Sequence, residues 1–154
     1  MILLGGARGR ERAVVMWIEG YASRFGKADL NDDVVARGAF RQSLQRSGPG
    51  GVRMLYQHQP KAVIGRWDEV FEDAGGLFVR GRVLEAGPEA RMVAALLKAG
   101  ALDGLSIGFR TVKSRKEGRL RVLTQVDLWE VSVVTFPMLT TARITRVGAE
   151  AVAA

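Results

Sequence analysis

The sequence contains no cysteine and a single histidine among its 154 residues. Without cysteine the chain can form neither a disulfide nor a thiolate nucleophile, which fits a protein of a reducing cytoplasm. One histidine, His58, in the absence of cysteine also excludes a zinc site of the usual composition. We therefore expect no metal and no other cofactor.

Long apolar runs are also missing, and none approaches the roughly 20 residues that a membrane-spanning helix needs. Near the N-terminus the short apolar stretch Ile2–Leu4 comes before the basic cluster Arg8–Arg12, which is the reverse of the order in a signal peptide. We expect a soluble intracellular protein with one domain, residues 1–154, whose core covers about residues 12–147.

Acidic residues are fewer than basic ones, 16 against 23, which gives a net charge of +7. Such a charge favours acidic partners, including nucleic acid and acidic peptides. The basic residues are spread along the chain, in pieces such as Arg8–Arg12 and Lys113–Arg121, without a basic helix or an RNA motif with interleaved aromatic residues. Charge alone therefore does not predict specific nucleic-acid binding.

Short alternating runs separated by turn signals predict a fold made mainly of strands. One helix is expected from Pro88 to Gly100 and a weaker one over Gly38–Arg46, while Gly148–Ala154 resembles a small-residue tail. We predict an α+β, mainly β fold, a closed or nearly closed antiparallel β-barrel with flanking helices. The expected strands are Arg12–Ser23, Val63–Glu72, Gly76–Leu84, Leu105–Val112, Leu120–Glu130, Ser132–Phe136 and Ala142–Val147, with Lys113–Arg119 as a solvated hairpin tip.

Residues Gly104–Gly108 read Gly-Leu-Ser-Ile-Gly, the G-x-S-x-G pattern of a nucleophilic serine. Glycines beside a serine leave room for a substrate carbonyl, yet in a glycine-rich chain the same pattern also describes an ordinary strand entry. In α/β-hydrolases the histidine follows the serine and the motif leads into a helix. Here His58 precedes Ser106, and the residues after Ser106 alternate as a strand, so that fold is excluded.

A serine hydroxyl needs a base to remove its proton, and His58 carries the only imidazole in the sequence. Pro60 disfavours helix and keeps the preceding backbone extended, so we expect His58 at a strand end or in a loop, projecting into a cleft. A hydrogen-bonded surface histidine would fit the same local sequence.

A third catalytic group would orient the imidazole, and Glu130 is the candidate. Strand alternation places Glu130 on a face that is otherwise largely apolar, where an unpaired carboxylate is costly. Glu130 should therefore have a partner, either His58 or one of the many arginines. Asp127 on the opposite face and Asp103 near the serine are the fallback carboxylates.

A second acidic cluster, Asp29, Asn31 and Asp33, has the spacing of the first ligands of a calcium loop. Val34 stands where that loop requires glycine, and Phe40 stands where it requires the bidentate glutamate. The cluster is therefore interpreted as a polar turn and not as a calcium site.

Segments spread over about residues 17–147 together resemble the prohead (capsid maturation) proteases of tailed bacteriophages. No single segment is specific, and the resemblance depends on their number and order. The matching segments are Ile18–Ala22, Asp33–Val35, Gly38–Phe40, Met54–His58, Ile64–Trp67, Gly76–Gly81, Asp103–Phe109, Asp127–Ser132 and Thr135–Pro137.

The resemblance implies the fold of the herpesvirus assemblin proteases, a β-barrel ringed by helices. It also implies a serine endopeptidase with Ser106 as nucleophile, His58 as general base and Glu130 as the third member. The herpesvirus relatives use a second histidine in that third role, which this chain lacks, so a carboxylate must replace it. Their oxyanion hole includes an arginine pair, whereas the corresponding stretch here is Pro137–Leu139, so we expect backbone N–H donors at the mouth of the barrel.

The family cleaves the scaffold segment of the major capsid protein, or a separate scaffold, and commonly itself. The implied partners are the major capsid protein and its scaffold segment, inside the procapsid that assembles in the cytoplasm of the bacterial host. The herpesvirus relatives act as dimers, which by analogy makes a homodimer a candidate assembly. Two other functions stay open from the sequence, a non-catalytic capsid-assembly or scaffold factor on the same barrel and a basic nucleic-acid-binding barrel.

Overall fold

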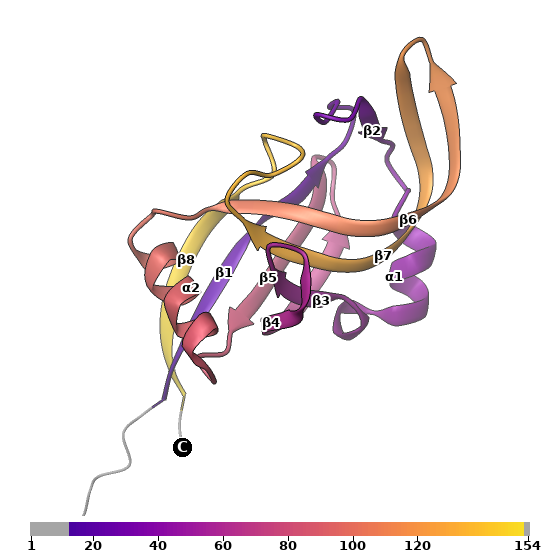
Figure 1. Cartoon of the computed structure of the whole chain (residues 1–154). Coiled ribbons are helices and arrows are strands. Elements are labelled where there is room, and N and C mark those ends of the chain that lie inside the picture. The colour runs from indigo at the N-terminus through magenta and orange to yellow at the C-terminus, as the bar shows by residue number, and fades with distance from the viewer. Residues whose placement is uncertain (1–12, 153–154) are drawn as a thin grey trace, which may run out of the picture.

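The computed structural model describes residues 13–152, which form one curved sheet flanked by short helices (Figure 1). Neither α-helix in this range is long and apolar enough to cross a membrane. The elements are β1 (Ala13–Arg24), β2 (Asp33–Val35), α1 (Arg41–Ser47), the 3-10 turn η1 (Pro49–Gly51), β3 (Arg53–Tyr56), β4 (Gln59–Glu72), β5 (Gly76–Val83), α2 (Pro88–Lys98), β6 (Gly104–Glu117), β7 (Leu120–Val134) and β8 (Ile144–Val152).

The long strand β7 organises the sheet because it is paired along both of its edges. One edge pairs with β6, and the other pairs first with β2 and then with β3. Between the segments paired with β2 and β3, this edge of β7 forms hydrogen bonds with the chain around α1. The N–H of Val126 donates to the carbonyl of Ala39, and the N–H of Leu128 donates to Ser43 Oγ. From β3 the sheet continues through β4, β5 and β1 to β8.

The expectation of a closed or nearly closed antiparallel barrel is confirmed for the mainly β fold but is wrong for fully antiparallel pairing and for closure. First, β2 and β3 both pair with β7 in parallel, because the crossover through α1 lets the two strands run in the same direction. Second, the sheet is not closed. In the described part of the chain, the segment before β8 pairs with β6 only at the start of that strand, through the isolated bridge between Gly104 and Arg143. Beyond that bridge, β6 and β1 separate around a pocket that both strands line.

The core lies inside the curve of the sheet, and every strand contributes apolar side chains to it. Trp67 is 1% exposed, and its Nε1 donates to the carbonyl of Val131 at 3.2 Å, so β4 is joined to β7 across the interior. Phe40, just before α1, is fully buried, and the apolar face of α2 contributes Val93 and Leu97. The largest buried side chains are Trp67, Phe40, Met16, Ile18, Met54, Ile64, Leu77, Leu105 and Leu123.

The mainly β content and both helices are confirmed, with differences at their ends. The helix after Pro88 ends at Lys98, and Gly100 follows with a φ of 71°, as a C-terminal glycine should. The weaker helix begins only at Arg41, three residues after Gly38, because Gly38 has a φ of 89° and belongs to a turn.

Two boundaries from the sequence are wrong. The tail proposed from Gly148 pairs with β1 up to Val152, since the absence of a side chain at Gly148 lets the Trp17 ring lie against the backbone. The separate strand expected at Ser132–Phe136 is the end of β7. The basic cluster Arg8–Arg12, along with residues 153 and 154, lies outside the described residues.

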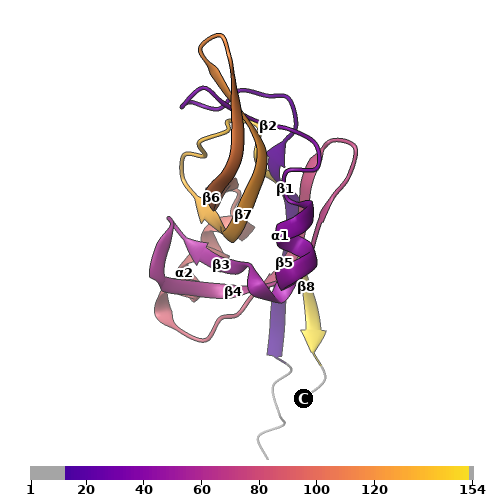
Figure 2. The same ribbon diagram turned by 90° about the vertical axis from the view of Figure 1, so that its right-hand side faces the viewer.

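The hairpin of β6 and β7 is longer than expected. Its strands stay paired as far as Glu117 and Leu120, so the turn itself is only Gly118 and Arg119. Figures 1 and 2 both show this hairpin extending past the rest of the molecule, beside β2.

Candidate active site

Ser106 lies on β6 in a regular strand and not on a sharp elbow. The ladder between β6 and β7 places it directly opposite Ser132, and both serines are buried. Directly opposed residues in an antiparallel pair share one face of the sheet. Because alternate residues of a strand also share a face, Ser106, Ser132 and Glu130 all lie on the same face.

The two glycines that flank Ser106 are required by close packing. Neither has a positive φ, so neither supplies the strained turn of a nucleophile elbow. A Cβ at Gly108 would overlap the carboxylate of Glu130, which is its partner across the ladder. A Cβ at Gly104 would lie 2.5 Å from the carbonyl oxygen of Val134. The second glycine of the motif therefore makes room for an acidic side chain, a reason that the sequence pattern did not reveal.

His58 lies in the two-residue turn between β3 and β4, as expected for a strand end. Gln57 and His58 have φ values of 53° and 60°, the left-handed region that tight hairpin turns require and that non-glycine residues rarely adopt. Contacts with the end of β7 and with the residue that follows it hold this turn. The N–H of Gln57 donates to the carbonyl of Val133 at 3.0 Å, and Gln57 Nε2 donates to Thr135 Oγ1 at 2.6 Å.

A closed ring of hydrogen bonds connects His58, Glu130 and Ser132. His58 Nδ1 contacts Glu130 Oε1, and Ser132 Oγ donates to Glu130 Oε2 at 2.6 Å. Ser132 Oγ also accepts the backbone N–H of His58 at 3.0 Å. Ser132 thus fixes both the carboxylate and the backbone that carries the imidazole. We did not single out Ser132 from the sequence, where the only signal was its place on the same face as Glu130.

The electrostatics of this pair favour an imidazole that can accept a proton. The hydrogen bond that His58 donates to Glu130 raises the pKa of His58 above its usual value, and this outweighs the opposing effect of burial. The carboxylate binds Nδ1 and so favours the tautomer with its proton there, which leaves Nε2 as the free acceptor. The His58 side chain is 43% exposed and that of Glu130 only 11%, so the ring reaches the surface while its partner is covered.

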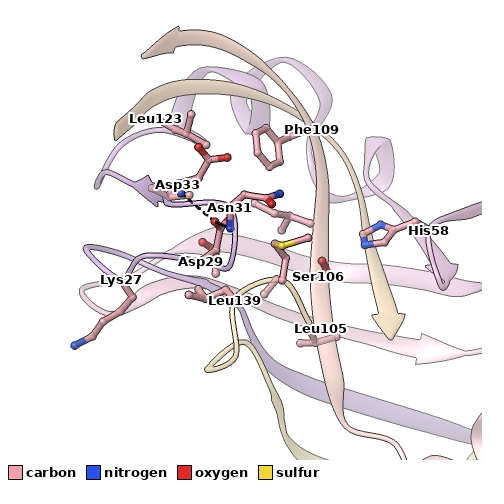
Figure 3. A pocket seen from close by; sticks show the side chains of 15 residues that line it. Lys27, Asp29, Asn31, Asp33, His58, Leu105, Ser106, Phe109, Leu123 and Leu139 are labelled. Atoms are coloured by element: carbon pink, nitrogen blue, oxygen red, sulfur yellow. Dashed lines mark hydrogen bonds between the residues drawn. The ribbon is translucent and has the colours of Figure 1, made fainter. Parts of the chain in front are cut away.

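Ser106 and His58 line the same cavity of about 180 Å³ (Figure 3). Figure 3 places Ser106 between His58 on one side and Asp29, Asn31 and Asp33 on the other. Within the described residues no hydrogen bond joins the side chains of Ser106 and His58; in enzymes generally, the hydrogen bond between a nucleophile and its base is often long in the absence of substrate. The remaining lining residues are Ala22, Ser23, Lys27, Val35, Leu105, Ile107, Phe109, Leu123, Met138 and Leu139.

The two fallback carboxylates are engaged elsewhere. Asp127 binds Arg46 and Arg110, and the hydrogen bond from Arg110 helps to hold the pKa of Asp127 below its usual value. Asp103 pairs with Arg143 at 2.8 Å. Of the three carboxylates weighed from the sequence, Glu130 alone contacts the imidazole.

The acidic cluster near Asp29 is a polar turn, as expected. Asp29 Oδ1 accepts the N–H groups of Asn31 and Asp33, at 2.8 and 3.0 Å. The Asp33 carboxylate forms two hydrogen bonds with Arg121, at 2.8 and 2.9 Å. These side chains form one wall of the cavity that contains Ser106.

Comparison with known proteins identifies the family. Residues 7–153 match the family of caudovirus prohead serine proteases. The chain belongs to this family. A curated member, the prohead protease of Enterobacteria phage HK97, is 35% identical over 124 residues, which are 77% of this chain and 54% of that protein. This chain therefore spans about half the length of that prohead protease.

Two solved proteases share the fold. The capsid assembly protease of bacteriophage T4 matches with a TM-score of 0.62 over 77% of this chain and 80% of its own, at 16% identity. The protease of Kaposi's sarcoma herpesvirus matches with a TM-score of 0.53 over 88% of this chain and 65% of its own, at 11% identity. At such identities the likeness concerns the fold, which is the assemblin-like fold expected for a prohead protease.

Proposed function

We propose that the chain is a serine endopeptidase of capsid maturation, with Ser106 as nucleophile, His58 as general base and Glu130 as the group that orients His58. The observation that supports this most directly is a cavity shared by a buried serine and a carboxylate-bound imidazole, in a member of the prohead protease family. A positioned base beside a hydroxyl is the chemical requirement for a serine nucleophile.

In the proposed reaction, His58 Nε2 takes the hydroxyl proton while Ser106 Oγ attacks the carbonyl of a peptide bond. His58 then gives this proton to the leaving amine as the C–N bond breaks, which leaves an acyl-enzyme. His58 next takes a proton from a water molecule that attacks the acyl carbonyl, and returns it to Ser106 Oγ as the ester bond breaks and the acid product leaves. Glu130 stabilises the imidazolium at each stage, and Ser132 keeps the carboxylate in place. Backbone N–H groups beside the cavity are proposed to stabilise the oxyanion.

The edge of β6 supports an extended binding mode for the substrate. The N–H of Leu105 points away from β7, since it donates to the carbonyl of Ala142 at 3.0 Å. Alternation along the strand then points the N–H and C=O of Ile107, next to the serine, toward the same outer side. A substrate segment could pair there as an added strand, with its side chains entering the cavity.

The proposed substrate is the scaffold segment of the major capsid protein, cut inside the procapsid. The relatives named as a prohead protease and as a capsid assembly protease support this choice. Self-cleavage is part of the same proposal.

The test is co-expression of the chain with the major capsid protein of the same virus, followed by intact-mass measurement of both. We expect the capsid protein to lose a terminal segment, and Ser106→Ala to abolish this loss while leaving assembly intact. A segment lost equally in Ser106→Ala would contradict the proposed nucleophile. Assembly that needs the chain without any cleavage would favour a non-catalytic assembly factor.

A further inference from the structure

The tip of the hairpin between β6 and β7, residues 113–119, is a basic extension that lies outside the packed core. All seven residues are exposed, and Figures 1 and 2 show the hairpin projecting beyond the other elements. It contributes no residue to the buried core. A long paired hairpin with so little burial is more consistent with a contact surface than with a stabilising element.

The charges of this tip are almost all of one sign. It carries Lys113, Arg115, Lys116 and Arg119 against a single carboxylate, Glu117, which pairs with Arg115 at 3.0 Å. In the part of the chain that the structure describes, the other three basic side chains have no acidic partner within ion-pair distance.

Two basic residues also face each other across the two strands. Lys116 lies directly opposite Arg121, an arrangement that destabilises a strand pair. Asp33 compensates the charge of Arg121 but not that of Lys116. An anionic partner would relieve the repulsion that remains.

The face of the hairpin that bears Lys116 and Arg121 is continuous with the proposed active-site cavity. Along β7, Arg121 and Leu123 lie on the same face, and their partners across the ladder are Lys116 and Ser114. Leu123 lines the cavity that contains Ser106, and so does Asp33, the residue that holds Arg121. Figure 3 shows Leu123 and Asp33 together on the wall opposite His58. A chain bound in the cavity can therefore continue along the face that bears Lys116.

We propose that this hairpin tip is a docking arm for an acidic segment of the polypeptide substrate, several residues away from the scissile bond. The inference deepens the proposed function and rests on it, because it uses the same cavity. A strand advances about 3.3 Å per residue. From Ser106 to Lys113 and to Glu117, the two ends of this strand segment of the tip, seven and eleven residues span about 23 and 36 Å, so an extended substrate would present its acidic side chains about seven to eleven residues from the cleavage site.

An acidic polypeptide fits the tip better than nucleic acid does. Residues 113–119 contain no aromatic side chain on which a base could stack, whereas proteins that bind single strands usually combine basic and aromatic residues. The connection of the tip to a cavity that we assign to peptide cleavage points to the same class of partner.

The test is a binding measurement with fluorescein-labelled decaglutamate as the probe and single-stranded decathymidylate as the comparison. All proteins carry Ser106→Ala, so that nothing is cleaved. The hairpin set adds Lys113→Gln, Lys116→Gln and Arg119→Gln. The matched control set adds Arg37→Gln, Arg41→Gln and Arg91→Gln, which are exposed residues outside the hairpin. Each set lowers the net charge of +7 by three.

We expect the hairpin set to weaken decaglutamate binding about tenfold in low salt, the control set to change it less than twofold, and the difference to shrink as salt screens the charges. Equal weakening by both sets would overturn the proposal, because net charge alone would then explain binding. No binding of decaglutamate, or tighter binding of decathymidylate through the same residues, would overturn it as well. Binding is measured here without catalysis, so a failed docking arm leaves the capsid-cleavage test unaffected.

Discussion

At the scale of single residues, the carboxylate of Glu130 has two partners, the imidazole of His58 and the hydroxyl of Ser132. Its hydrogen bond raises the pKa of His58. A general base must be neutral to accept a proton, so activity should fall as the pH drops through this raised pKa. The acidic limb of kcat/KM is therefore expected above pH 6.5, the usual value for histidine.

Glu130→Gln removes the charge that raises the pKa of His58. We expect its acidic limb to move to lower pH and its plateau kcat to fall about 100-fold or more, because the tautomer and the imidazolium lose their support. The measurement is a pH profile of cleavage between pH 5 and 9. Asp127→Asn and Asp103→Asn serve as controls, and the acidic limb of their pH profiles should lie at the same pH as in the wild type. A limb that stays in place in Glu130→Gln would show that this carboxylate does not act on His58.

The candidate residues could be predicted from the sequence where chemistry leaves few choices. His58 carries the single imidazole of the sequence, so no other histidine could be the base. Glu130 is a carboxylate on an apolar strand face, and a carboxylate there needs a polar partner close by. Ser132 and Gly108 could not be assigned roles in the same way. Their roles depend on which residue lies opposite which across the ladder, and the sequence does not give the register.

At the scale of elements, β6 and β7 lie so close together that two positions of β6 have no room for a side chain. The two glycines there, Gly104 and Gly108, make room for different parts of β7. The Cβ of an alanine at position 108 would displace the end of a flexible side chain, Glu130, whereas at position 104 it would press on the backbone of Val134. Steric strain against a side-chain end is relieved by rotation, but strain against backbone requires the strands to move.

We therefore expect Gly108→Ala to lower kcat about tenfold or more with a small loss of stability, because the carboxylate leaves His58. Gly104→Ala should instead cost about 1–3 kcal/mol of unfolding free energy. Urea denaturation and initial rates, measured on the same two variants, separate the outcomes. Similar stability losses for both, with unchanged kcat in the folded fraction, would contradict this division.

The elements themselves were predictable where the pattern is local. Alternation and turn residues located β1, β4 and β5, and proline and glycine marked the ends of α2. The pairing of β2 and β3 with β7 was not predictable, because these short strands are set by contacts about 75–90 residues apart, such as Tyr56 with Val133 and Asp33 with Arg121. The closed barrel failed for a related reason, since whether two edges meet depends on the curvature of the whole sheet.

At the scale of the whole molecule, the raised pKa of His58 couples folding to pH. A pKa that is higher in the folded state means that the protonated histidine stabilises the fold. This contribution is fully present below about pH 6.5, the unfolded value, and is lost as the pH rises through the folded-state pKa.

The expected result is a pH-dependent difference between the wild type and His58→Gln. The urea midpoint of the wild type should exceed that of the variant most at pH 5.5 to 6, and the excess should decline toward pH 9. The two proteins differ only at residue 58, so the comparison isolates the contribution of the pair formed by His58 and Glu130. An excess that is constant over this range would mean that the pair contributes no proton-linked stability.

The walls of the cavity come from chain segments that are remote in sequence. These are β1, the turn after it, β2, the turn before β4, β6, β7 and the residues after Pro137. The turn before β4 and strand β6 are held in the cavity wall by the long-range ladders of β3 and β6 with β7. Under the proposed function, a chain truncated before β7 would lack Glu130 and the cavity wall around Leu123, and would therefore be inactive. In the proposed protease, completion of the sheet would therefore precede activity.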